Sequence, residues 1–270
     1  MTQRIASTVI LWLVLIAVLA VGGVHGAYFI LTAAALLTQW EAYGLIRKTG
    51  GQPQVWAGLA AGALHLVGFA YLPYIGLHPL AGLALGFTLL VLFVLVRSPA
   101  SECVSVFSAT AGGLAVPLML GFFLPILQSG QILLAVWIIA AAKFTDAGAL
   151  LVGLKLGRTS FSPVLSPNKT WEGVIGGILV SVVVSLLFQL LFSRYLPVGF
   201  TPLFALWAAV PVAVASITAD LFESALKRSA GVKDSGRTIP GIGGIFDLTD
   251  SFLLAAPVGF LLLSGLLAGL

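Results

Sequence analysis

Residues 174–192, V-I-G-G-I-L-V-S-V-V-V-S-L-L-F-Q-L-L-F, contain no charged side chain. A helix that crosses a bilayer needs about 20 predominantly apolar residues, and this segment meets that requirement. Across the whole chain 60% of residues are hydrophobic, 8% are charged, and the mean hydropathy is +1.13. Soluble domains average about 45–50% apolar and about 25% charged residues. The sequence therefore predicts an all-α, polytopic integral membrane protein.

Working outward from this segment, the same criterion predicts about nine transmembrane helices. The divisions at residues 22–26 and 128–130 have the weakest turn signals. The predicted helices cover residues 5–24, 27–46, 55–74, 79–96, 104–127, 131–154, 174–192, 202–226 and 252–269.

The basic residues fall almost wholly on one side of this arrangement, which indicates topology because positive charge marks cytoplasmic loops. Arg194 lies on the opposite side, and Lys143 lies within a span. The N-terminus is therefore predicted to be cytoplasmic, and the isoelectric point near 9.4 does not indicate nucleic-acid binding. The residues on the cytoplasmic side are Arg4, Arg47, Lys48, Arg97, Lys155, Arg158, Lys169, Lys227, Arg228, Lys233 and Arg237.

Two predicted cytoplasmic connections, residues 155–173 and 228–251, are long and rich in Gly, Pro, Ser and Thr. Function in such a chain is expected on these loops. In the first, Ser166, Lys169 and Arg158 are candidate phosphate contacts, and Thr170 is a candidate N-cap of the following helix. His25, His65 and His78 all lie outside both loops, which argues against zinc and Ser-His-Asp chemistry.

Acidic residues gather around the second loop. Asp220 has no basic neighbour three or four positions away, so its neutralising charge must come from elsewhere, and a metal ion is a good candidate. Asp247 and Asp250 at the start of the last helix either complement its dipole or join Asp220 in holding a divalent cation such as Mg²⁺. Glycines 241, 243 and 244 permit either close approach of an anion or a tight turn.

Other charges inside the spans have both structural and functional interpretations. Lys143 and Asp146 can neutralise each other at i, i+3, and Glu223 and Lys227 can pair at i, i+4. Glu41 is interpreted as interfacial or helix-capping. These charges also leave open a transporter, in which they would line an ion path, although the sequence shows no inverted repeat.

Two blocks together resemble the phosphatidate cytidylyltransferase (CDP-diacylglycerol synthase) family over roughly residues 146–251. One is G-L-K-L-G-R-T-S-F-S-P-V-L-S-P-N-K-T-W-E-G-V-I-G-G from residue 153, and the other is D-L-F-E-S-A-L-K-R from residue 220, continuing to D-L-T-D-S at 247–251. The resemblance implies transfer of the cytidylyl group of CTP to phosphatidate, giving CDP-diacylglycerol and pyrophosphate for phospholipid biosynthesis. It also implies Mg²⁺, with a second metal ion as an option, a homodimer in the bilayer, and a site on the cytoplasmic face of a bacterial inner membrane.

The resemblance further implies roles for individual residues, on a catalytic part covering 131–270 that follows a variable transmembrane part covering 1–130. Metal ligation falls on Asp220 and Asp247. Catalytic positions fall on Lys227, Arg228, Lys233, Asp234 and Asp250, and substrate-binding positions on Asp146, Ser166, Lys169, Glu172, Ser224 and Arg237.

The chain departs from the family pattern at two positions, where the family has His and Arg and this sequence has Ile242 and Leu248. Three explanations remain open: an active enzyme in which Arg237, Arg158 or Lys143 supplies the missing charge, a different lipid phosphate or nucleotide as substrate, or low or no activity.

Overall fold

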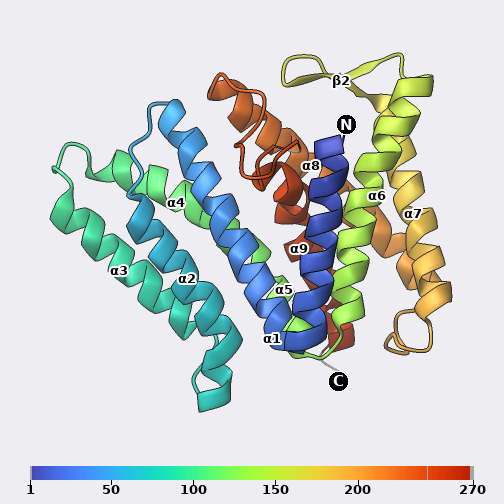
Figure 1. The fold of residues 1–270 in the computed structure, drawn as a ribbon, viewed down its shortest axis with the longest axis horizontal. Coiled ribbons are helices and arrows are strands. Elements are labelled where there is room, and N and C mark those ends of the chain that lie inside the picture. The colour runs from blue at the N-terminus through green and yellow to red at the C-terminus, as the bar shows by residue number, and fades with distance from the viewer. Residues whose placement is uncertain (1, 242, 268–270) are drawn as a thin grey trace. The chain divides into compact units, whose positions relative to one another are not determined.

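The computed structural model describes residues 2–241 and 243–267, and helices make up most of that part of the chain (Figure 1). The predicted all-α class is confirmed apart from one short ribbon. The elements are α1 (Thr2–Lys48), α2 (Val55–Tyr71), the 3₁₀ helix η1 (Leu72–Ile75), α3 (Ala81–Arg97), α4 (Cys103–Leu120), α5 (Phe123–Gln128), α6 (Ile132–Leu156), β1 (Ser160–Ser162), β2 (Ser166–Thr170), α7 (Trp171–Phe192), α8 (Pro202–Ser229) and α9 (Phe246–Leu267).

Within the described residues, 7 helical segments are long and apolar enough to cross a membrane. They match the predicted spans with two differences. Residues 13–48 form one of them although two spans were predicted there, and α3, at 17 residues, is shorter than the other spans. The length and composition of these helices show an integral membrane protein. The number of about nine transmembrane helices stays a prediction.

The backbone of α1 leaves helical geometry at Gly23, where φ is 53° and ψ is −130°. Figure 1 shows the two arms of α1 meeting at this sharp bend. Glycine adopts a positive φ at little cost, because it has no side chain to collide with the backbone. The break falls within residues 22–26, where the sequence predicted a turn.

The structure subdivides one predicted span and shortens both predicted loops. Residues 104–127 are interrupted after Leu120, so that α5 follows α4 as a separate short helix. The loop predicted over 155–173 contains the antiparallel ribbon β1–β2, in which Ser162 pairs with Ser166. This ribbon was not predicted, because a pair of such short strands has no clear periodicity.

The chain divides into two compact units. Unit 1 comprises the residues up to Leu124 together with Leu226–Thr249, and unit 2 comprises Pro125–Ala225 together with the residues from Asp250 onward. In unit 1, the buried Gln39 and Tyr43 of α1 tie their helix to its neighbours. Gln39 Nε2 donates to Gly58 O of α2 at 2.9 Å, and the Tyr43 hydroxyl donates to Thr110 O of α4 at 2.9 Å.

In unit 2, α6 and α7 lie side by side and pack through small residues and polar bridges (Figure 1). Trp137 Nε1 donates to Ser185 Oγ at 3.0 Å, and Ser181 Oγ donates to Ala141 O at 3.0 Å. Small residues let helix backbones approach closely in membranes. A Cβ atom at Gly177 would lie 2.6 Å from Thr145 O, so the α6–α7 contact requires glycine at that position.

We expect Gly177→Ala to destabilise the protein. The added methyl would meet backbone rather than a flexible side chain, and overpacking of this kind costs roughly 1–3 kcal/mol. A lower thermal unfolding temperature of the purified protein in detergent would be the measured effect. Gly265→Ala is the matched control, because a Cβ atom there meets nothing within 4 Å. Equal unfolding temperatures for the two variants would contradict this packing.

Candidate active site

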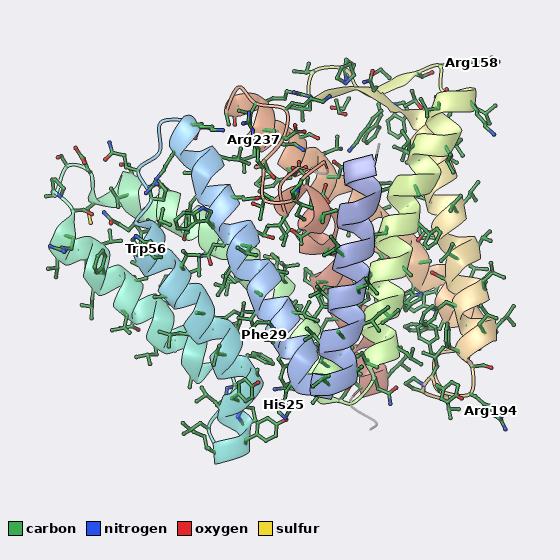
Figure 2. The ribbon with its side chains drawn as sticks, in the orientation of Figure 1. His25, Phe29, Trp56, Arg158, Arg194 and Arg237 are labelled. Carbon is green, nitrogen blue, oxygen red and sulfur yellow. The ribbon has the colours of Figure 1, made fainter. Side chains whose placement is uncertain are left out.

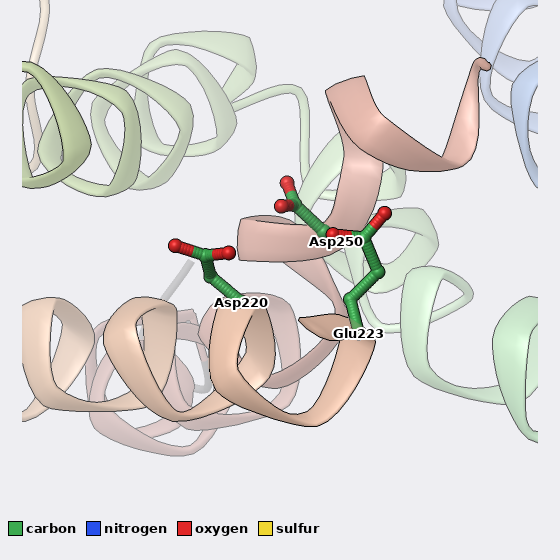
Figure 3. Close-up of side chains that lie close together, drawn as sticks. All are labelled: Asp220, Glu223 and Asp250. Atoms are coloured by element: carbon green, nitrogen blue, oxygen red, sulfur yellow. The ribbon is translucent and has the colours of Figure 1, made fainter. Parts of the chain in front are cut away.

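Three carboxylates converge in unit 2, two from the end of α8 and one from the start of α9. Oxygen atoms of Asp220, Glu223 and Asp250 all lie within 4.8 Å of one another, and Figure 3 shows the three side chains close together. Glu223 is 1% exposed and Asp250 is 7% exposed, whereas the Asp220 side chain is 27% exposed. Carboxylate oxygens are the ligands that Mg²⁺ prefers, so this donor set fits a magnesium ion.

Two lysines of unit 2 balance this negative charge. Lys169 Nζ, from β2, lies 2.5 Å from Asp220 Oδ2. Lys143 Nζ, from α6, lies 3.7 Å from Asp146 Oδ2 and 3.6 Å from Asp250 Oδ1. The predicted i, i+3 pair of Lys143 and Asp146 is therefore confirmed. Since Lys143 also reaches Asp250, the pair belongs to the carboxylate site rather than to an isolated stretch of α6.

A cleft of about 710 Å³ opens beside Asp220 and Lys169. The polar side chains of Asp146 and Ser166 also line it, while Leu150, Leu154 and Ile217 supply apolar wall. The cleft thus combines charged groups suited to a phosphate with a surface suited to hydrocarbon. Its full lining consists of Asp146, Ala149, Leu150, Gly153, Leu154, Ser166, Pro167, Asn168, Lys169, Thr170, Gly173, Val174, Ile217 and Asp220.

The β1–β2 ribbon is tied at its base to the first turn of α7, which carries Glu172. Glu172 Oε2 accepts hydrogen bonds from the backbone N–H groups of Arg158 at 3.1 Å and Thr159 at 3.3 Å. Thr170 Oγ1 accepts from Gly173 N at 3.1 Å, which confirms the predicted N-cap of α7. Glu172, predicted to bind substrate, is thus engaged with backbone, and its role toward substrate stays a prediction.

Asp247, in unit 1, is surrounded by donors. Its Oδ1 accepts from Lys227 Nζ at 2.8 Å, and its Oδ2 accepts from Gly244 N at 2.8 Å and from Ser235 Oγ at 2.9 Å. The backbone N–H of Ser235 adds a further contact at 3.1 Å. Metal ligation by Asp247 remains a prediction, and a metal ion there would have to compete with these donors.

The remaining predicted site residues are more exposed. Lys233, Asp234 and Arg237 lie on the surface of the loop between α8 and α9, and Figure 2 shows Arg237 near that loop. Arg228 is exposed and Ser224 is half-buried on α8. Of the two positions that depart from the family pattern, Leu248 is half-buried in the first turn of α9, and Ile242 lies outside the described residues.

The structure adds three residues that the predicted site did not include. The sequence already showed Glu223 and Lys143 as charges within predicted spans. A charge in a span indicates a functional site, and this signal could have placed both residues with Asp220 and Asp250. Glu41 was interpreted as interfacial or as a cap, yet it is 6% exposed and accepts the N–H of Phe246, the first residue of α9. It therefore caps a distant helix rather than its own.

The profile of the cytidylyltransferase family matches residues 2–266, nearly the whole chain. The chain belongs to the cytidylyltransferase family. The resemblance predicted from the two motif blocks is thereby confirmed at the level of the family.

Individual relatives of this cytidylyltransferase-family chain match over shorter regions. The phosphatidate cytidylyltransferase of Thermotoga maritima is 41% identical over 152 residues, which cover 54% of this chain and 54% of that protein. The protein of the same name from Bacillus subtilis is 44% identical over 120 residues, covering 44% and 43%. That of Haemophilus influenzae is 41% identical over 128 residues, covering 47% and 43%. The chain thus spans about half the length of the curated relatives it matches.

The carboxylate cluster predicts where this cytidylyltransferase-family chain binds a divalent ion. We expect Asp220→Asn and Asp250→Asn each to weaken Mn²⁺ binding about tenfold or more in the purified protein, because each removes a charged oxygen ligand. Electron paramagnetic resonance of free Mn²⁺ measures this. Glu102→Gln, at an exposed position before α4, serves as the control. Full affinity in Asp250→Asn together with a loss in Asp247→Asn would instead favour the predicted pair of Asp220 and Asp247.

Proposed function

We propose that the protein transfers the cytidylyl group of CTP to phosphatidate, forming CDP-diacylglycerol and releasing pyrophosphate. The observation that carries this proposal is the cleft of unit 2, in which Asp220 and Lys169 lie beside a wall of leucine and isoleucine side chains. A polar end of this kind suits two phosphate groups, and an apolar wall suits an acyl chain. Membership in the cytidylyltransferase family and the names of the relatives support the same reaction.

The chemistry requires little acid–base assistance from the protein. The phosphate monoester of phosphatidate is already ionised at neutral pH, so its oxygen can attack the α-phosphorus of CTP without a general base. A new P–O bond forms, and the bond to the β-phosphate breaks as pyrophosphate leaves. Both motif loops lack histidine in the sequence, which is consistent with such a reaction.

The main obstacle is the repulsion between two polyanions. Lys169 and Lys143 are the cations of unit 2 nearest the carboxylates, and we assign them to the phosphate oxygens, with Ser166 as a hydrogen-bond donor. Asp220 is the central metal ligand in this proposal. Glu223 and Asp250 complete its set, and Asp247 is the alternative partner that the motif implies. Bound Mg²⁺ would supply charge neutralisation for the phosphates.

The remaining motif residues are assigned by the resemblance. Lys227, Arg228, Lys233 and Asp234 act at the nucleotide, and Ser224, Arg237, Asp146 and Glu172 contact substrate. We further propose about nine membrane crossings with the N-terminus and both loops in the cytoplasm, a location in a bacterial inner membrane, and a homodimer. The distribution of charge supports this orientation: in unit 2, Arg158 and Arg194 lie at opposite ends of α7 (Figure 2).

The proposed reaction predicts release of pyrophosphate from CTP and phosphatidate only when Mg²⁺ is present. Asp220→Asn should lower turnover about a hundredfold or more, since it removes a charged group that acts on the transition state. Glu102→Gln, at an exposed position before α4, is the control and should leave turnover unchanged. Absence of turnover in the wild-type protein across several divalent metals and lipid phosphates would refute the proposal.

The effect of the two departures from the family pattern is tested by putting the family's residues, His and Arg, back at positions 242 and 248. We expect Ile242→His combined with Leu248→Arg to change kcat/KM for CTP by less than about threefold, because another basic residue of the chain, Arg237, Arg158 or Lys143, supplies the missing positive charge. Steady-state kinetics beside the wild type would measure this. A gain of a hundredfold would instead mean that the natural chain is a weakened enzyme.

A further inference from the structure

Glu41 lies outside both motif blocks, on α1, yet its carboxylate contacts the loop between α8 and α9. The side chain is 6% exposed. Its Oε2 accepts from Ser235 Oγ at 3.1 Å and from the backbone N–H of Phe246 at 2.9 Å, and its Oε1 accepts from Thr238 Oγ1. One carboxylate thus binds three points along the loop, from near its middle to the first residue of α9.

The loop backbone approaches the Glu41 carboxylate closely at two glycines. A Cβ atom at Gly236 would lie 2.4 Å from Glu41 Oε1, and one at Gly244 would lie 2.3 Å from Glu41 Oε2. Glycine at both positions lets the backbone come up against the acid on two sides. A buried charge is held in this way only when its hydrogen-bonding capacity is met, and here the donors come from the loop itself.

Ser235 connects Glu41 with Asp247. Its hydroxyl lies 3.1 Å from Glu41 Oε2 and 2.9 Å from Asp247 Oδ2. A hydroxyl has one proton, so it donates to one of these carboxylates at a time. The backbone N–H of Ser235 also donates to Asp247, at 3.1 Å. Moving Ser235 therefore changes two of the donors that surround Asp247.

We propose that Glu41 is a positioning residue, which holds the loop of residues 230–245 and thereby sets the environment of Asp247. It does so through the Ser235 hydroxyl and the first amide of α9. This inference rests on the proposed function, because it matters for turnover only if Asp247 acts in the metal-dependent reaction. Within unit 1, α1, which lies outside the recognised motifs, then contributes to the surroundings of Asp247.

The test compares Glu41→Ala with Glu41→Gln by two measurements. Glutamine keeps an acceptor for Ser235 and Phe246, and its amide can donate to the Thr238 hydroxyl. Alanine removes all three contacts. The first measurement is trypsin cleavage after Lys233 and Arg237, which are exposed on the loop, followed by mass spectrometry. The second is the Mg²⁺ concentration that gives half-maximal turnover.

We expect Glu41→Ala to speed cleavage of the loop and to raise the required Mg²⁺ about tenfold or more, whereas Glu41→Gln stays within about threefold of the wild type. Ser235→Ala should raise the Mg²⁺ requirement in the same direction. The double variant Glu41→Ala with Ser235→Ala should raise the Mg²⁺ requirement by less than the product of the two single effects, because the hydrogen bond between Glu41 and Ser235 is counted in both single variants.

Thr110→Val is the matched control for loss of stability alone. Thr110 is buried in the same unit, and its Oγ1 accepts from Gln54 N at 2.9 Å, away from the loop. This variant should lower the unfolding temperature without changing loop cleavage or the Mg²⁺ requirement. If Glu41→Ala behaved like Thr110→Val in both measurements, Glu41 would be a structural residue and the inference would be wrong.

The proposed reaction can be refuted without refuting the positioning role of Glu41. If the wild-type protein does not turn over CTP and phosphatidate, loop cleavage and Mn²⁺ affinity decide the inference without activity. Faster cleavage with weaker Mn²⁺ binding in Glu41→Ala would then support a positioning role. Wild-type values in either measurement would overturn it.

Discussion

The compensation of buried carboxylates is the constraint on which the rest of this structure depends. An ionised side chain within a membrane span costs several kcal/mol unless it is paired or hydrogen-bonded. Asp220 is matched by Lys169, Asp247 by Lys227, and Asp146 and Asp250 share Lys143. Two of these partners, Lys143 and Lys227, lie on helices α6 and α8, whereas Lys169 is brought to Asp220 by the β1–β2 ribbon of the first loop.

The partners differ in kind, and the difference has a functional meaning. The lysines neutralise charge, and in the proposed reaction they would turn toward the phosphates of a substrate, since an ammonium on a flexible stem reorients easily. Glu41 is instead held by hydroxyl and amide donors that belong to the loop backbone and its short side chains. The lysine–carboxylate pairs can exchange partners, whereas the hydrogen bonds of Glu41 fix the position of the loop between α8 and α9.

Local sequence relations predicted much of this arrangement. The apolar runs marked the spans, the spacing of Lys143 and Asp146 predicted their ion pair, and Thr170 before an apolar run predicted its cap. Glu41 and Ser235 are 194 positions apart, so no periodicity could connect them. The β1–β2 ribbon and the donors around Asp247 likewise depend on how loops fold back, which composition does not determine.

The β1–β2 ribbon places an unusual restriction on how this loop can change in evolution. Surface loops generally tolerate insertions and deletions. Lys169, however, reaches Asp220 from a strand, where neighbouring side chains point to opposite faces. Loss or gain of a single residue within β2, between Ser166 and Lys169, would move the Lys169 side chain to the opposite face of the strand. Drift in the length of this segment should therefore be rare even where its individual residues vary.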